Sequence, residues 1–192
     1  EAQRQCIYAD PDFQDGAYYN TGREPKTGIG LARMQAMVSY RSHAAYEHKF
    51  GRRRIDPEDG SDLPDDWQAG NPESETPFNA PFSVETYLKY QGEKFHNRFD
   101  ANSYITLTQL MDTHDIGRGR GGIQSAAAQC TQPVHVIGID SDVLYPVSEQ
   151  EDLADALPNA QLSIVRNDDG HDGFLLAQDA IGPIIHEFLD EV

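Results

Sequence analysis

The sequence predicts an α/β protein that holds the last part of a parallel sheet and a layer of helices before it. Two short apolar runs, at 133–140 and 160–167, are separated by a helical pattern, and a third amphipathic segment closes the chain. This order of strand, helix, strand and helix is typical of parallel sheets. Because two strands are too few to close such a sheet, we expect its first strands to lie outside this chain.

The first half of the sequence predicts loops and helices. Residues 1–28 mix aromatic side chains with turn-forming residues, and we expect a surface loop that connects from a preceding N-terminal part. Residues 29–50 contain no proline and a single glycine, which predicts one helix. Residues 51–82 carry prolines, glycines and acids without periodicity, which indicates a loop insertion. We expect residues 29–130 to form a helical lid region that this loop interrupts.

Two further helices are predicted before the strands. Apolar side chains recur at helical spacing in 83–99 and again in 101–115. Each set can share one face of its helix, as expected of helices that pack against a core. The helical spacing of apolar residues ends before the first apolar run.

Residues 131–192 are expected to form the C-terminal part of the core. The run at 133–140 predicts a buried strand, and the capping-box spacing of Ser148 and Glu151 predicts that a helix begins there. The final helix tolerates Pro183 only if that residue lies in its first turn. Its apolar stripe consists of Ile181, Ile184, Ile185, Phe188, Leu189 and Val192.

Charge and composition argue against several classes of protein. The 192 residues include 15 Lys and Arg against 32 Asp and Glu, a net charge of -17, whereas nucleic-acid binding needs clustered cations. No run of about 18 apolar residues is present, so we expect no membrane span. Cys6 and Cys130 are far apart and His43 and His48 have no third ligand, so we expect neither a disulfide framework nor a metal site.

A carboxylate and a histidine follow the two predicted strands. Asp140 and Asp142 come after the first strand, and His171 comes after the second. In open α/β sheets, functional residues lie in the loops beyond the carboxyl ends of the strands. We therefore expect an acid and the histidine to meet there. A carboxylate on one imidazole nitrogen leaves the other nitrogen to act as a general base. We favour Asp142 as the acid, with Asp140 as its nearest rival.

The predicted pair lacks a nucleophile within the chain. Acid followed by histidine is the end of the order Ser, Asp, His in α/β-hydrolases, whose serine lies in a G-x-S-x-G turn. The sequence contains no such turn, so we expect the nucleophile to lie outside it. An alternative interpretation makes His171 a solvated surface residue. The glycines of GRGRGG at 117–122 follow a helix rather than a strand, which argues against a dinucleotide site.

The chain resembles the C-terminal half of the homoserine O-acetyltransferase family in four ordered motifs. These are GLAR (30–33), FDANSYITLT (99–108), SDVLYP (141–146) and GHDGFL (170–175). The stretch MDTHDIGRGRGG looks closest to fungal members. The resemblance implies an α/β-hydrolase fold with a helical lid, whose first strands, oxyanion hole and serine nucleophile belong to an N-terminal half.

The resemblance also implies a reaction and its partners. It implies a ping-pong acyltransferase of methionine biosynthesis, which moves acetyl from acetyl-CoA to a serine and then to the hydroxyl of homoserine. Acetyl-CoA is then a co-substrate and no cofactor is bound permanently. The enzyme would be cytoplasmic, with the N-terminal half and a second copy at the lid as protein partners. Alternatives are a serine O-acyltransferase, another alcohol acetyltransferase, an acetylesterase, or a non-catalytic α/β module.

The family motifs assign roles to five residues. His171 matches the base and Asp142 its orienting acid. Arg33 matches a position that pairs with the substrate carboxylate in fork geometry, and Tyr40 matches another amino-acid contact on the same helix face. Asp172 would bind the substrate ammonium group. The alternatives for Arg33 and Tyr40 are a surface cation and a packed aromatic residue.

Overall fold

A computed structural model describes residues 1–56, 58–63 and 80–191. The chain forms two compact units. The first comprises Glu1–Val38 and Tyr46–Thr106, and the second comprises Ser39–Ala45 and Leu107–Val192. No helix in the described part of the chain is both long enough and apolar enough to cross a membrane.

The first unit is built from helices. It contains α1, the 3-10 helix η1 and α4, together with parts of α2, α3 and α5. The bounds are α1 (Ala2–Tyr8), η1 (Pro11–Gly16), α2 (Lys26–Tyr40), α3 (His43–Lys49), α4 (Ser83–Phe95) and α5 (Ala101–Thr113).

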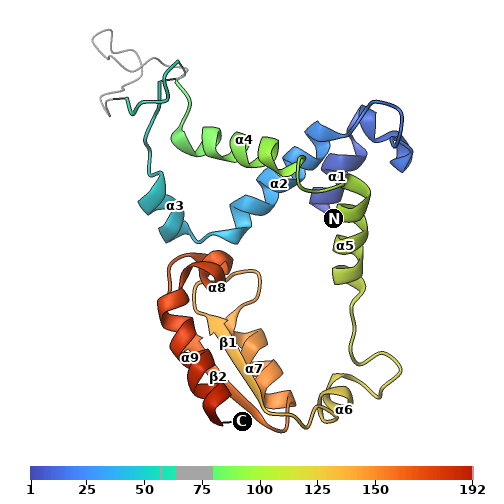
Figure 1. Ribbon diagram of the computed structural model, residues 1–192, viewed down its shortest axis with the longest axis vertical. Coiled ribbons are helices and arrows are strands. Elements are labelled where there is room, and N and C mark those ends of the chain that lie inside the picture. The colour runs from blue at the N-terminus through green and yellow to red at the C-terminus, as the bar shows by residue number, and fades with distance from the viewer. Residues whose placement is uncertain (57, 64–79, 192) are drawn as a thin grey trace. The chain divides into compact units, whose positions relative to one another are not determined.

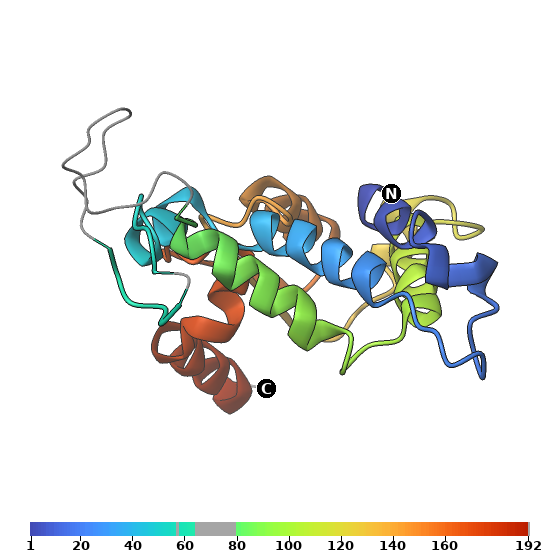
Figure 2. The same cartoon turned by 90° about the horizontal axis from the view of Figure 1, so that it is seen from above.

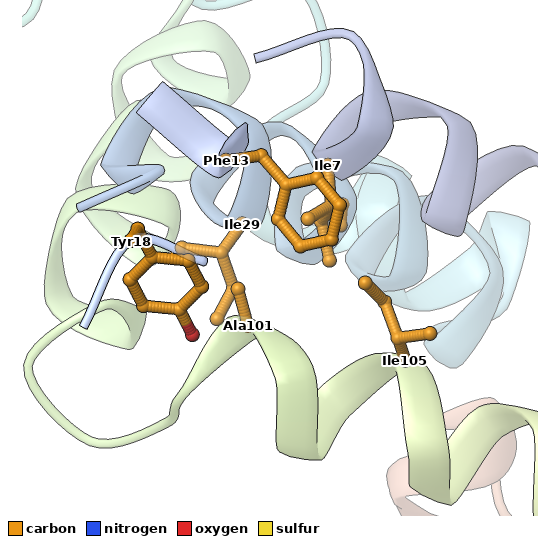
Figure 3. Packing of buried hydrophobic residues seen from close by; sticks show 7 residues of the cluster. Ile7, Phe13, Tyr18, Ile29, Ala101 and Ile105 are labelled. Atoms are coloured by element: carbon orange, nitrogen blue, oxygen red, sulfur yellow. The ribbon is translucent and has the colours of Figure 1, made fainter. Parts of the chain in front are cut away.

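Residues 1–28 are not the surface loop that the sequence predicts. They contain α1 and η1, whose apolar side chains are buried against α2 and α5. The buried cluster consists of Ile7, Phe13, Tyr18, Ile29, Ala32, Ala101 and Ile105 (Figure 3). The loop prediction is wrong because Asp10 and Pro11 separate two short helices, and their burial depends on residues far away in the sequence.

The single helix predicted at 29–50 is divided in two. Arg41 and Ser42 separate α2 from α3. The Oγ atom of Ser42 accepts a hydrogen bond of 3.0 Å from the backbone N–H of Ala45. Because a serine that satisfies an N–H in the first turn favours a helix start, the chain begins a new helix here instead of continuing the old one.

The helix predicted at 83–99 is present as α4, which ends at Phe95. In Figure 2, α4 (green) runs alongside α2 (light blue). The contact is so close that a Cβ atom on Gly92 would lie 2.9 Å from the carbonyl oxygen of Gly30. This pair of helices therefore depends on the absence of a side chain at Gly92.

The loop insertion predicted at 51–82 lies partly outside the described residues, at 57 and 64–79. In its described part, isolated antiparallel bridges pair Arg54 with Phe82 and Ile55 with Asp62.

The carboxylate of Asp100 links the start of α5 to the N-terminal segment. Its Oδ2 atom accepts hydrogen bonds from the backbone N–H of Ser103 at 2.8 Å and from the hydroxyl of Tyr19 at 3.0 Å. Its Oδ1 atom accepts a hydrogen bond from the hydroxyl of Tyr18. Burial raises the pKa of Asp100, but these hydrogen bonds together lower it by more than burial raises it. The pKa of Asp100 therefore lies below its ordinary value.

Replacing Asp100 with asparagine is expected to remove an acid-sensitive part of the stability. A carboxyl group whose pKa is lower in the folded state stabilises the fold above its unfolded pKa, and this stability is lost as the pH falls through the folded pKa. Urea midpoints of the wild type should therefore fall more steeply below about pH 4 than those of Asp100→Asn. Tyr18→Phe removes one of the hydrogen bonds, so the fall of its urea midpoint with pH should be intermediate between those of the wild type and Asp100→Asn. Identical pH dependence of the urea midpoint in the wild type and Asp100→Asn would contradict the prediction.

The second unit contains a parallel two-stranded sheet. Strands β1 (Val134–Ile139) and β2 (Ala160–Val165) pair in parallel along their whole length, so the predicted pairing of the two apolar runs is confirmed. Helix α7 (Val147–Ala156) connects the strands, and α7 and α9 (Gln178–Glu191) flank opposite faces of the sheet (Figure 1). The shorter elements are α6 (Ile123–Ala127), η2 (Gly170–Asp172) and α8 (Gly173–Leu176).

The predicted capping box of α7 is wrong. The N-cap residue is Pro146, in an extended conformation, and it makes no side-chain hydrogen bond to the helix. Ser148 therefore lies inside the first turn, where it cannot cap the helix together with Glu151.

Helix α9 differs from the prediction at Pro183. The helix already begins at Gln178, so Pro183 lies in the second turn rather than the first. The predicted apolar stripe is only half covered, since Ile185 is 45% exposed and Leu189 is 62% exposed. Val192, the last member of the stripe, lies outside the described residues.

Candidate active site

The two parallel strands deliver Asp142 and His171 to the same edge of the sheet. Ile139, the last residue of β1, pairs with Val165, the last residue of β2. Asp142 follows β1 in a short turn, and His171 follows β2 in η2. Because parallel strands end at the same edge, the two loops leave the sheet side by side.

Asp142 and His171 form a hydrogen-bonded pair. The Oδ2 atom of Asp142 lies 2.8 Å from Nδ1 of His171. Its Oδ1 atom accepts hydrogen bonds from the backbone N–H groups of Leu144 at 2.8 Å and Tyr145 at 3.1 Å. The Asp142 side chain is only 8% exposed, so both carboxylate oxygens are held in place. An ionised Asp142 can only accept, which places a proton on Nδ1 and leaves Nε2 as the basic nitrogen.

Asp140, the rival acid, has a different partner. Its Oδ1 atom accepts a hydrogen bond of 3.0 Å from the backbone N–H of Asn167. Ser141 connects the same two loops, because its hydroxyl donates to the carbonyl of Asn167 and accepts a hydrogen bond of 2.9 Å from the N–H of Gly170. Asp140 and Ser141 therefore tie the loops together, and Asp142 is the residue that meets His171.

The imidazole ring of His171 is enclosed by aromatic side chains. The ring of Tyr40 packs edge-on with its centroid at 5.4 Å, and the rings of Tyr145 and Phe174 lie at 5.3 Å each. The His171 side chain is 21% exposed, which contradicts the alternative of a solvated surface histidine. A pocket of about 250 Å³ adjoins it, lined by Ile137, Gly138, Ile139, Asp142, Tyr145, Gln150, His171 and Phe174. Asp142 and His171 thus both line this pocket.

The remaining predicted residues divide between the two units. Tyr40 and Asp172 belong to the unit that contains His171, whereas Arg33 belongs to the other unit. The Arg33 guanidinium lies 5.2 Å from the centre of the Phe95 ring. The carboxylate of Asp172 is 22% exposed and lies 3.9 Å from Nη1 of Arg41. The substrate contacts of these three residues stay predictions.

Arg41 is a residue of this site that the sequence did not reveal. Its Nη2 atom donates a hydrogen bond of 2.5 Å to Oδ1 of Asp169, and its side chain is 15% exposed. Read as part of one continuous helix at 29–50, Arg41 looks like an ordinary surface cation. The helix break after Tyr40, which the helical periodicity of the sequence does not show, brings Arg41 into this site.

Possible metal ligands and the two arginines of the GRGRGG loop also lie in the described part of the chain. No cluster of three or more His, Cys, Asp or Glu side chains within residues 1–56, 58–63 and 80–191 could hold a metal ion. In the GRGRGG loop, Arg118 donates to the carbonyl of Thr113 at 2.7 Å and Arg120 to the carbonyl of Ile116 at 2.8 Å. Arg118 thus binds the last residue of α5, and Arg120 binds a residue between α5 and the loop.

Replacing Gly170 with alanine is expected to damage this site. Gly170 has φ of +69°, and a Cβ atom there would lie 2.7 Å from the nitrogen of Ser42 and 2.9 Å from the oxygen of Tyr40. Gly119 has a similar φ of +71°, but a Cβ atom there would have no neighbour within 4 Å. In both alanine variants the left-handed backbone should lower the free energy of unfolding by about 1–2 kcal/mol. In Gly170→Ala the clash should lower the free energy of unfolding by about 1–3 kcal/mol more.

Urea unfolding of the two glycine variants measures this difference. Equal losses at Gly170 and Gly119 would show that the approach of Tyr40 and Ser42 to Gly170 is not as close as the structure has it.

Fold and site together define the class of the protein. A parallel sheet with an acid after one strand and a histidine after the next is the C-terminal part of an α/β-hydrolase fold. A solved homoserine O-acetyltransferase from Bacillus anthracis has this fold, with a TM-score of 0.77 and 19% identity over 97% of this chain and 47% of that one. Esterase E22 gives a TM-score of 0.75 and 15% identity over 98% of this chain and 48% of its own.

Sequence relatives narrow the class to one family. No family model matches the chain. The homoserine O-acetyltransferase of Salinibacter ruber is 44% identical over 184 residues, which are 96% of this chain and 47% of that protein. The protein of the same name from Chlorobium luteolum is 43% identical over 192 residues, 100% of this chain and 47% of its own length.

The chain belongs to the homoserine O-acetyltransferase family, and it spans about half the length of the curated relatives it matches. These relatives are bacterial, so the likeness to fungal members stays a prediction.

Proposed function

We propose that this chain supplies the acid and the base of an acyltransferase that acetylates the hydroxyl of homoserine with acetyl-CoA. The observation that carries the proposal is the hydrogen bond of 2.8 Å between Asp142 and His171, found in a chain that is 44% identical to a homoserine O-acetyltransferase. Methionine biosynthesis in the cytoplasm would be the setting of such an enzyme.

A serine nucleophile is proposed to come from the half of the relatives' length that this chain does not match. Nε2 of His171 would take the proton of the serine hydroxyl while its oxygen attacks the carbonyl carbon of the acetyl thioester. The carbon–sulfur bond breaks, and CoA leaves as the thiol with the proton from His171. Base catalysis of this kind contributes roughly 10²–10⁴-fold to the rate.

The second half of the reaction uses the same base. Nε2 of His171 takes the proton of the homoserine hydroxyl, whose oxygen attacks the acetyl-serine ester. The ester bond to the serine breaks, and His171 returns the proton to the serine oxygen. Throughout both halves, Asp142 stabilises the positive charge that develops on the imidazole ring.

Three residues are proposed to bind the amino-acid acceptor. Arg33 would pair with its carboxylate, Asp172 with its ammonium group, and Tyr40, whose ring contacts His171, would border the acceptor. Acetyl-CoA would be a co-substrate and no permanent cofactor is required. The helices of 29–130 would form a lid that also joins two copies of the enzyme.

An acetylesterase is the second candidate, because solved structures with the same fold include the acetyl esterase MekB, with a TM-score of 0.69 and 20% identity.

An acceptor assay separates the two candidates. The full-length protein should be incubated with acetyl-CoA in three separate reactions, which contain homoserine, serine or buffer alone. We expect O-acetylhomoserine to form much faster than free acetate. Transfer to water alone would contradict the transferase, and transfer to serine alone would contradict the proposed acceptor.

A further inference from the structure

We infer that Arg41 is a positioning residue, which holds the loop 168–172 so that His171 and Asp172 keep the geometry needed for transfer to an amino-acid acceptor. The part of this inference that concerns the acceptor rests on the proposed function. The part that concerns His171 applies to any acyl transfer at this site.

One guanidinium group contacts carboxylates on both sides of His171. Nη2 of Arg41 donates to Oδ1 of Asp169 at 2.5 Å, and Nη1 lies 3.9 Å from Oδ2 of Asp172. The three side chains are 15%, 28% and 22% exposed, so water screens these contacts only in part. Because Asp169 and Asp172 flank the base, Arg41 restrains the backbone on either side of it.

The same segment makes two further contacts with the loop. The hydroxyl of Ser42 donates to the carbonyl of Asp168, and the backbone at Tyr40 and Ser42 approaches Gly170 so closely that no side chain fits there. Ser42 and Gly170 fix where the loop lies. Arg41 adds contacts to the side chains of the loop, and it is therefore suited to set their orientation.

Arg41 is poorly arranged as a simple stabiliser. Its Nε atom is buried and has no hydrogen-bond partner within the described part of the chain. A buried donor without a partner costs stability, and a buried ion pair contributes little net stability. A planar guanidinium does, however, fix the direction of the carboxylates it meets. The geometry is therefore better explained by positioning than by stability.

The test uses the full-length protein and two assays. Hydrolysis of 4-nitrophenyl acetate needs His171 but no amino-acid acceptor, whereas the KM for homoserine reports on Asp172. The variants are Arg41→Met, Asp169→Asn, the double variant and Arg41→Lys. Arg23→Met is the matched control, because it removes another Arg–Asp pair, with Asp12 at 3.6 Å, whose side chains are 68% and 45% exposed.

Arg41→Met is expected to lower kcat for the ester about 10- to 100-fold, since small displacements of catalytic groups have effects of this size. It should also raise the KM for homoserine about 10-fold. The double variant should be no worse than Arg41→Met, because residues that act as one unit are not additive. Arg41→Lys should recover part of the ester activity, and Arg23→Met should match the wild type.

Three results would overturn the inference. Wild-type kcat and KM in Arg41→Met, with only a lower melting temperature, would make Arg41 merely structural. If the loss of kcat in the double variant equalled the product of the losses in the two single variants, Arg41 and Asp169 would act independently. If Arg41→Met does not fold, full ester activity in both Arg41→Lys and Asp169→Asn would also contradict positioning. Failure of the proposed function appears separately, as a wild type that cleaves the ester but does not acetylate homoserine.

Discussion

Replacing His171 with alanine is expected to lower kcat of the full-length protein by about 10⁴- to 10⁶-fold, the range found when a catalytic base of this kind is removed. The reason lies in the geometry of the ring. Nδ1 is held by Asp142 at 2.8 Å, so Nε2 is the nitrogen that can accept a proton from a nucleophile. Alanine removes the base and leaves the nucleophile without activation.

The matched control for this variant is His114→Ala. His114 is an exposed histidine that follows α5. Its loss should leave kcat within a factor of about two of the wild type, as is usual for exposed positions away from a site. The measurement is kcat of both variants by steady-state kinetics, after circular dichroism has shown that each variant is folded. A His171→Ala variant that keeps a tenth of the wild-type activity would contradict the assignment of His171 as the base.

Replacing Asp142 with asparagine is expected to lower kcat by about 10⁴-fold while the fold is kept. An asparagine oxygen can still accept the hydrogen bonds that Oδ1 receives from Leu144 and Tyr145 at 2.8 and 3.1 Å. The amide NH₂ group would then face Nδ1 of His171 and donate to it. The ring would carry its proton on Nε2 instead, which is the wrong tautomer for a base.

Asp140→Asn is the control for Asp142→Asn. Asparagine at 140 can still accept the hydrogen bond of 3.0 Å from the N–H of Asn167, so both the loop and the activity should survive. We expect kcat of Asp140→Asn to stay within about threefold of the wild type. If the two variants lost activity equally, Asp142 would not be the orienting acid, and the choice between these neighbouring carboxylates would have to be reversed.

The sequence predicted the pairing of the two strands and the contact between Asp142 and His171 because both depend on local patterns. Each strand is a short apolar run bounded by turn residues, and the loop after each strand carries one member of the Asp142–His171 pair. Parallel pairing then brings Asp142 and His171 together without further information. The sequence favoured Asp142 over Asp140, and the structure adds the reason that Asp140 is engaged by the backbone N–H of Asn167, in the loop after the other strand.

Features that depend on distant contacts could not be predicted. The break at Arg41 and Ser42 coincides with contacts to Asp168 and Asp169, which are more than a hundred residues away in the sequence. Periodicity reports only on neighbours three and four positions apart, so it extended the helix through the break. The N-terminal aromatic residues likewise looked like loop residues until α2 and α5 buried them.

Trapping of an acetyl-enzyme tests most directly whether Asp142 and His171 serve a nucleophile outside these 192 residues. The full-length protein would be mixed with acetyl-CoA in the absence of an acceptor, quenched in acid and analysed by peptide mass spectrometry. We expect one acetyl group per protein, on a serine that precedes this chain, and its disappearance when homoserine is added. An acetyl group on a residue of this chain, or no acetyl-enzyme in a protein that makes O-acetylhomoserine, would contradict this mechanism.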